Sequence, residues 1–437
     1  AVVRSLLEHH DALRMRFRRG AAGWTQWNAG VEEAVPVTEV DLREVREGGE
    51  REAIEAECAR AQKSLDLDKG PVLRVVMMNL GAGRAGRVLI VIHHLVVDGV
   101  SWRILMEDFQ TAFAQLRQGQ TIHLPPKTTS YKAWSEQLSI FARSDEVRSE
   151  REYWSKLERV GAMGLPVDLS EGENTEDSAD VVESALSPEE TVSLLRDVPA
   201  VYGTEINDVL LTAFAGSVAK WIGSRIVVVD VESHGRELFA EGIDLSRTVG
   251  WFTAVVPVLL DLRSIYAPGE ALKAIKEQLR SIPRRGVGYS LLRYIRTDDE
   301  LTQGSSSEFN TQVSFNYLGQ MDRVNTSSEL FRIAHESSGE PRCPSGKRSY
   351  LIDVTSVIAD GQLRVTWTYS KRRHHCRSIE NVAADFLQEL RHLIRHCQSP
   401  ESGGFTPSDF ALAGLNQKQL DKIMRKVSGN KAQGRYE

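Results

Sequence analysis

Apolar residues recur with two different spacings in successive segments of the first half of the chain. Short segments in which every second residue is apolar predict strands, and longer segments with apolar residues every three to four positions predict helices. The uninterrupted apolar run Val88–Ile92 indicates a buried strand. We expect an opening helix over 3–13, strands over 23–27, 35–40, 72–79 and 87–94, and helices over 50–64, 101–118, 131–142 and 146–159.

The same spacings return after residue 180. Ser187 is a good helix N-cap, and Pro188 is well suited to the first helical turn. We expect strands over 181–186, 226–232, 253–260, 308–317, 351–358 and 363–369, and helices from 188 and over 206–221, 269–281 and 379–395. The pattern predicts an α/β protein with two lobes, each built on a mostly buried sheet.

A polar, acidic and aperiodic stretch over 168–177 separates the two halves. The chain has 437 residues, which exceeds the usual size of a single core. We therefore expect an N-terminal lobe over 1–167, a linker over 168–180, a C-terminal lobe over 181–412, and a C-terminal helix and tail over 413–437.

Composition narrows the function. With 41% hydrophobic and 26% charged residues, the chain is typical of globular proteins. Its formal charge of −6 and its lack of an extended Lys/Arg block argue against nucleic-acid binding. No apolar stretch approaches the roughly 20 residues needed to cross a bilayer, and the first residues lack a signal-peptide pattern. We expect a cytoplasmic protein without membrane contact.

A group of histidines and cysteines near the C-terminal end resembles a zinc-ligand set. His392 and His396 are one helical turn apart, and 374–376 (His-His-Cys) and Cys397 could complete the set. Several Lys and Arg residues surround them, which favours a solvated basic surface. We therefore predict no metal site.

The strongest chemical signal is the string His93-His94-Leu95-Val96-Val97-Asp98-Gly99, which joins the buried strand to a helix. Imidazole titrates near neutral pH, and a strand end fixes where the side chain points, so the string suits proton transfer. A second signal ends the strand over 226–232. Period-two alternation places Asp230 and Glu232 on one face, with Glu232 at the exit, where it can act as an acid or base.

These strings resemble those of a known family. HHxxxDGxSWxxL over 93–105 resembles the active-site motif of the condensation superfamily of nonribosomal peptide synthetases, and its DGVSWRIL part resembles epimerization domains. ESHGRE is similar to their EGHGRE motif, with Ser233 in place of Gly. Further strings resembling RTVGWFT, PxxGxGYG and FNYLGQ follow in order at 247–253, 283–289 and 315–320.

The resemblance implies two lobes of chloramphenicol-acetyltransferase-like topology that form a V with a tunnel between them. It implies cofactor-independent inversion, from L to D, of the α-carbon of an aminoacyl or peptidyl thioester. The substrate would be carried on the phosphopantetheine of an upstream peptidyl carrier protein. A downstream synthetase subunit is a further expected partner, through the C-terminal tail. The family usually begins with a PIQxWF-like segment, so we expect part of the first lobe to be missing from this sequence.

The resemblance also implies roles for single residues. Inversion needs two acid/base groups that flank one carbon, and the candidates are His94 and Glu232, one from each lobe. His93 is expected to be structural, and Asp98 to pair with Arg236. The enolate oxygen needs a donor, which could be His94, Asn316, Tyr317 or a backbone N–H, and these alternatives stay open.

Two other functions compete with epimerization. A condensation domain, which forms peptide bonds between carrier-bound substrates, uses the same histidine motif but has no need of Glu232 as a proton donor. An inactive carrier-docking module would keep the fold without the chemistry.

Overall fold

The computed structural model describes residues 1–21, 23–46, 48–160, 164–237, 241–295, 311–321 and 331–433. The chain divides into two units. Unit 1 comprises 1–144, 234–254 and 323–346, and unit 2 comprises 145–233, 255–322 and 347–437. None of the helices in the described ranges is both long enough and apolar enough to cross a membrane.

This division differs from the expected boundaries. The helices over 145–159 group with unit 2 rather than with the N-terminal lobe, while 234–254 and 323–346 group with unit 1. The expected linker also belongs to unit 2. There Asn174 donates a hydrogen bond to the Tyr350 carbonyl at 2.7 Å, and Thr175 and Ser178 close a capping box. Contacts between residues distant in sequence, which periodicity does not reveal, determine the boundaries.

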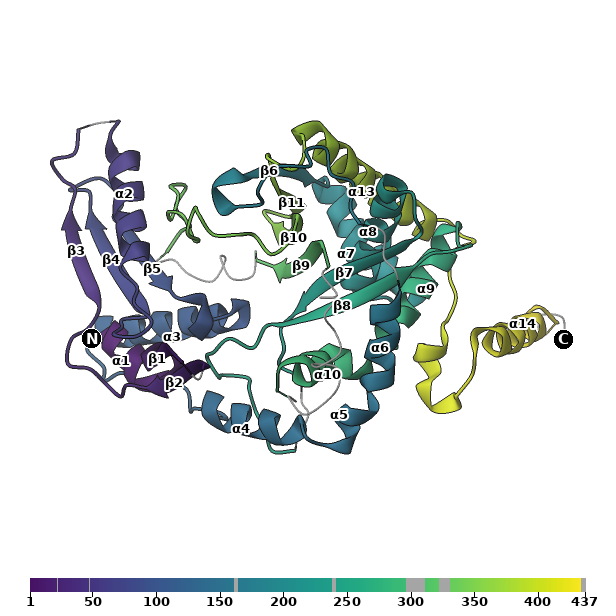
Figure 1. The fold of residues 1–437 in the computed structure, drawn as a ribbon, viewed down its shortest axis with the longest axis horizontal. Helices are drawn as coiled ribbons and strands as arrows, with labels where there is room; N and C mark the ends of the chain where they lie inside the picture. Colours follow the sequence, from purple (N-terminus) through teal and green to yellow (C-terminus); the bar gives the residue numbers. More distant parts are fainter. Residues whose placement is uncertain are drawn as a thin grey trace. The chain divides into compact units, whose positions relative to one another are not determined.

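Unit 1 contains a three-stranded sheet in the order β3-β4-β5 (Figure 1). β3 pairs in parallel with β4, and β4 pairs antiparallel with β5. The helix α2 packs on one face through Ile54, Cys58 and Ala61. The elements of unit 1 are α1 (Val2–His9), β1 (Met15–Gly20), β2 (Gly23–Asn28), β3 (Val37–Asp41), α2 (Glu50–Lys63), β4 (Leu73–Asn79), β5 (Arg87–Ile92), α3 (Gly99–Arg117) and α4 (Tyr131–Phe141).

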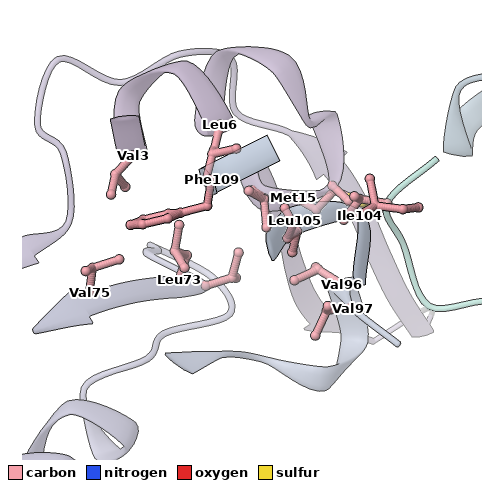
Figure 2. Packing of buried hydrophobic residues seen from close by; sticks show 14 of the residues in the cluster. Val3, Leu6, Met15, Leu73, Val75, Val96, Val97, Ile104, Leu105 and Phe109 are labelled. Atoms are coloured by element: carbon pink, nitrogen blue, oxygen red, sulfur yellow. The ribbon is translucent and has the colours of Figure 1, made fainter. Parts of the chain in front are cut away.

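The other face of this sheet carries the core shown in Figure 2. Phe109 of α3 packs over Leu73 and Val75, while Val96 and Val97, which follow His94 after Leu95, are buried. Burying one such side chain contributes about 1.5–3 kcal/mol. The segment that follows His94 is therefore anchored in the core of unit 1.

Two expectations in this unit are wrong in detail. The opening helix ends at His9 instead of residue 13, and a 3-10 turn over 11–14 leads into β1, a strand that the periodicity did not indicate. The strand expected over 87–94 ends at Ile92.

Unit 2 is built on a six-stranded sheet in the order β6-β11-β10-β9-β7-β8. β7, β9 and β10 run parallel, and β10, β11 and β6 are antiparallel neighbours. Its strands are β6 (Ala179–Ala185), β7 (Ile226–Ser233), β8 (Ala254–Asp261), β9 (Val313–Gln320), β10 (Ile352–Ala359) and β11 (Gln362–Ser370). Residues 308–310 of the expected strand over 308–317 lie outside the described residues.

Helices α7, α8 and α13 pack together against this sheet (Figure 1). Ser187 and Glu190 form a capping box at the start of α7, which confirms the predicted helix start. The helices are α5 (Asp145–Ser149), α6 (Arg151–Arg159), α7 (Pro188–Tyr202), α8 (Ile206–Ile222), α9 (Pro268–Arg280), α10 (Val287–Ser290), α13 (Cys376–Cys397) and α14 (Gln417–Gln433). A π-helical turn over Leu291–Ile295 follows α10.

A loop segment over 335–338 is fastened to β5 and α2 within unit 1. Arg87 forms an ion pair with Glu336 at 2.7 Å, and the Ser337 N–H donates to Glu55 at 3.0 Å. The Arg87 guanidinium lowers the pKa of Glu336 to about 2. Ionised Glu336 and ionised Glu55 each form one of the contacts that attach this segment. Its attachment therefore depends on both negative charges.

We predict that Arg87→Ala releases this segment, because Glu336 loses its guanidinium partner. Hydrogen–deuterium exchange of peptides that cover 335–340 should become faster. Arg84→Ala is the matched control, since Arg84 pairs with Glu50 instead of with the segment. Equal exchange in the Arg87→Ala variant and the parent protein would contradict the proposed anchor.

Candidate active site

The two histidines lie in a turn directly after β5. His93 caps a 3-10 turn over His94–Val96, and its Nδ1 accepts a hydrogen bond from the Leu95 N–H at 3.2 Å. Burial and the neighbouring His94 lower the pKa of His93. The His93 ring is thus engaged inside the turn in its neutral form, which favours a structural role.

His94 is exposed, and its ring lies beside Trp251. The two ring centroids are 5.9 Å apart in an edge-to-face arrangement, and Trp251 is 41% exposed. A molecule that reaches His94 from solvent can therefore also contact the indole. Sequence reasoning gave Trp251 no role at the histidine, because the two residues are 157 positions apart in the chain.

Asp98 is the best-connected buried carboxylate of the described residues of unit 1. It is 3% exposed and accepts hydrogen bonds from the backbone N–H groups of Ser101 at 2.7 Å and Phe252 at 3.1 Å. The first bond caps α3, and the second holds a segment distant in sequence. Such bonds to a charged group are about twice as strong as those between neutral groups.

Arg236 supplies the countercharge. Its Nη2 lies 3.1 and 3.3 Å from the two oxygens of Asp98, so the predicted contact is confirmed. The geometry differs from a two-nitrogen fork, because Nη1 instead donates to the carbonyls of Leu245 and Thr248, each at 2.9 Å. The guanidinium also stacks over the Phe252 ring, 4.0 Å from its centroid. Burial lowers the pKa of Arg236, which Asp98 opposes.

Glycines allow the backbone to approach closely around this pair. Gly235 has φ +62°, and a Cβ there would lie 1.6 Å from the Phe252 carbonyl oxygen. Ser233, by contrast, is the last residue of β7 and is not among the described non-glycine residues with positive φ. The departure from the EGHGRE motif therefore causes no backbone strain.

Glu232 lies near the end of β7 in unit 2. Its Oε2 accepts a hydrogen bond from Asn316 Nδ2 at 2.5 Å, across the parallel pairing of β7 and β9. The register explains this contact, because Asp230 pairs with Ser314 and Glu232 and Asn316 lie two residues further along each strand. Asn316 thereby fixes the orientation of the carboxylate, and its amide carries a second hydrogen that can donate to a substrate.

Asp230 lies on the same face of β7, as the alternation predicts. Its Oδ2 accepts a hydrogen bond from the Tyr350 hydroxyl at 2.8 Å. Burial raises the pKa of Asp230, while hydrogen bonds from Thr311 and Tyr350 act in the opposite direction. No sequence motif pointed to Tyr350, which precedes β10.

Tyr317 follows Asn316 on β9, so alternation directs its side chain to the opposite face. Burial raises the pKa of Tyr317, which keeps its hydroxyl protonated at neutral pH. It remains a candidate hydrogen-bond donor, although the contacts of β9 link Asn316, rather than Tyr317, to Glu232.

The histidines near the C-terminal end that resemble part of a zinc-ligand set make separate contacts with other residues. His374 is buried with its Nε2 2.9 Å from the Pro166 carbonyl oxygen, and His396 contacts the Tyr202 hydroxyl at 2.8 Å. The expectation of a solvated surface is wrong for His374 and for Cys397, which are both buried.

Among the described residues, possible metal ligands gather at His9, His10 and Asp108 in unit 1. Asp108 is fully buried and already binds His10 at 2.9 Å and Arg247 at 2.5 Å. A guanidinium this close opposes a metal cation, and we interpret the group as a buried ion-pair network.

Comparison with known proteins places these features in a family. The condensation-domain family profile matches residues 1–415. The chain is 46% identical over 426 residues to one of the linear gramicidin synthase proteins of Brevibacillus parabrevis. That match covers 97% of this chain and only 6% of the relative.

Two solved structures are similar to this chain. The epimerization domain from the third module of tyrocidine synthetase B is 35% identical, with a TM-score of 0.84 over 91% of this chain and 88% of that domain. The condensation domain of the monacolin K polyketide synthase MokA is 16% identical, with a TM-score of 0.68 over 90% of this chain and 88% of that one. This second likeness supports the fold alone.

We predict that Asp98→Ala lowers the free energy of unfolding by about 3–5 kcal/mol, because Arg236 would stay buried without its counterion. Urea denaturation measures the change. Asp41→Ala is the control, since Asp41 forms an exposed pair with Arg43, and its loss should have no measurable effect. An Asp98→Ala protein as stable as Asp41→Ala would contradict the assignment of Asp98 as the organising residue.

Proposed function

The chain belongs to the condensation-domain family of nonribosomal peptide synthetases, and from this premise we propose that it is an epimerization domain. Its reaction is inversion, from L to D, of the α-carbon of an aminoacyl or peptidyl thioester. The observation that carries the proposal is the Glu232 carboxylate, held by Asn316 at the end of β7. Peptide-bond formation has no need of this second acid/base group, whereas inversion requires one.

The reaction consists of two proton transfers at one carbon. One of His94 and Glu232 takes the α-proton, and the electron pair of the C–H bond passes into an enolate of the thioester. The other group returns a proton to the opposite face, so atoms and electrons balance and no oxidant is needed. General acid–base catalysis of this kind typically contributes 10²–10⁴-fold to a rate.

The surroundings of the two groups suit these roles. His94 is exposed, and the rest of its turn is anchored by buried Val96 and Val97. The negative charge on the enolate oxygen needs a donor. His94 as imidazolium, the second amide hydrogen of Asn316, the protonated hydroxyl of Tyr317 and a backbone N–H are the candidates.

The substrate arrives covalently bound, on the phosphopantetheine of an upstream peptidyl carrier protein. We propose no cofactor of the domain's own, since deprotonation next to a thioester needs only the two acid/base groups. A cytoplasmic location and a tunnel between the lobes remain predictions from the sequence.

We predict that His94→Ala and Glu232→Gln each lower the rate of D-product formation by at least about 10²-fold. The assay loads a carrier protein with an L-aminoacyl thioester and follows its chirality. His123→Ala and Glu183→Gln are matched controls, because both residues are exposed and Glu183 lies on β6 of the same sheet as Glu232.

Glu232→Gln with the wild-type rate of inversion would show that the two-base mechanism is wrong. Formation of a dipeptide from two loaded carriers, without inversion, would instead identify a condensation domain. His93→Ala should act mainly through stability, with a loss of about 0.5–2 kcal/mol for the cap.

A second prediction concerns the C-terminal segment. Lys276 is buried, and its Nζ donates to Asp409 at 2.5 Å and to the Tyr202 carbonyl at 2.9 Å. This contact attaches the residues before Gly414 to unit 2, and α14 begins only at Gln417. Truncation after Leu415 keeps the Lys276–Asp409 contact and removes the helix.

We expect the truncated protein to keep its isomerase activity on a carrier supplied in trans, while transfer to a downstream synthetase subunit falls. The pair of assays on one protein separates the two roles. Loss of the isomerase activity itself would show that α14 belongs to the enzyme body.

A further inference from the structure

Two rows of polar side chains cross one face of the sheet in unit 2. Strand register places one residue from each of β7, β9 and β10 in each row. The first row is Asp230, Ser314 and Asp353, and the second is Glu232, Asn316 and Thr355. The alternate residues Val229, Phe315 and Val354 are buried on the other face.

Tyr350 contacts the first of these rows. Its hydroxyl donates to Asp230, while its backbone carbonyl is held by Asn174 at 2.7 Å. Burial raises the pKa of Tyr350, and the negative charges of Asp230, Asp353 and Glu232 raise it further. Tyr350 is therefore a protonated donor directed at Asp230, in the electrostatic field of Glu232.

The groups that favour the ionised form of Asp230 come from three other parts of unit 2. Thr311 precedes β9, Tyr350 precedes β10, and Arg293 lies in the π-helical turn after α10. The two hydrogen bonds and the positive charge of Arg293 all favour the ionised carboxylate, against the desolvation that burial imposes.

Asp230 and Glu232 are two residues apart on one strand face, so their Cα atoms lie roughly 7 Å from each other. Both side chains are partly buried, and solvent screens such a pair less than an exposed one. A like charge at this distance disfavours ionisation of its neighbour.

Building on the proposed function, we propose that Asp230 and Tyr350 are positioning residues for Glu232. The hydrogen bond from the Tyr350 hydroxyl favours the ionised form of Asp230, and the charge on Asp230 strengthens the affinity of Glu232 for the proton that it exchanges with the substrate. A carboxylate whose pKa lies nearer to the operating pH serves better as both base and acid at physiological pH.

The pH dependence of kcat/KM for inversion tests this role. Asp230→Asn removes the neighbouring negative charge, which stabilises ionised Glu232. The limb that Glu232 sets, acidic if Glu232 is the base and basic if it is the acid, should therefore move down by about one pH unit. Tyr350→Phe should move it in the same direction by less. Asp230→Glu keeps the charge and should keep the limb near its original pH.

Tyr369→Phe is the matched control, because the Tyr369 hydroxyl lies 3.4 Å from Asp180 in a similar pair on β11 and β6. It should leave the limb in place. Unchanged limbs in both Asp230→Asn and Tyr350→Phe, in an active enzyme, would overturn the inference.

A titration independent of activity completes the test. The carboxyl carbon of Glu232, labelled with ¹³C and assigned through Glu232→Gln, should titrate at lower pH in Asp230→Asn and Tyr350→Phe than in the parent protein. An identical titration in all three proteins would overturn the inference even if the domain is active. A parent protein that never inverts its substrate would overturn the proposed function alone, and the titration would still decide the role of Asp230.

Discussion

The rest of unit 1 depends on the contacts made by the buried carboxylate of Asp98. It caps α3 through Ser101, accepts the Phe252 N–H and neutralises Arg236. Three stretches of chain thus converge on two oxygens. Because burying an ion pair costs desolvation energy, we attribute its value to specificity, since few other arrangements would satisfy every donor.

Asp98 and Arg236 each lie close in sequence to a proposed catalytic group. His94 precedes Asp98 by four residues, and Glu232 precedes Arg236 by four. A short segment separates each catalytic candidate from its member of the pair, and residues in each segment make contacts within unit 1. Buried Val96 and Val97 hold the first, and Gly235, packed against the Phe252 carbonyl, holds the second.

Much of this arrangement could be predicted from the sequence, for identifiable reasons. Periodicity located the strands of the three-stranded and six-stranded sheets and β2, but missed β1, which pairs with β2 in a sheet of two strands. Ser187 and Pro188 marked a helix start correctly. The Asp98–Arg236 contact followed from the family resemblance, and Asp230 and Glu232 share a face because strands alternate.

The parts of the fold and of the candidate site that could not be predicted depend on contacts that no local sequence pattern encodes. The strand expected over 87–94 included His93 and His94, but the chain leaves β5 at Ile92 and enters a 3-10 turn. The division into units depends on pairs such as Arg87 and Glu336, 249 residues apart. Tyr350 precedes β10 and meets Asp230 of β7 although β9 lies between these two strands in the sheet.

The central claim is that two different groups serve the two faces of one carbon. The most direct measurement incubates an L-aminoacyl carrier protein with the domain in deuterated water and analyses each enantiomer at low conversion. A two-base enzyme places deuterium at the α-carbon of the D-product, while the remaining L-substrate keeps most of its hydrogen. Equal deuterium in both enantiomers at the first turnovers, or product without α-deuterium, would contradict the account.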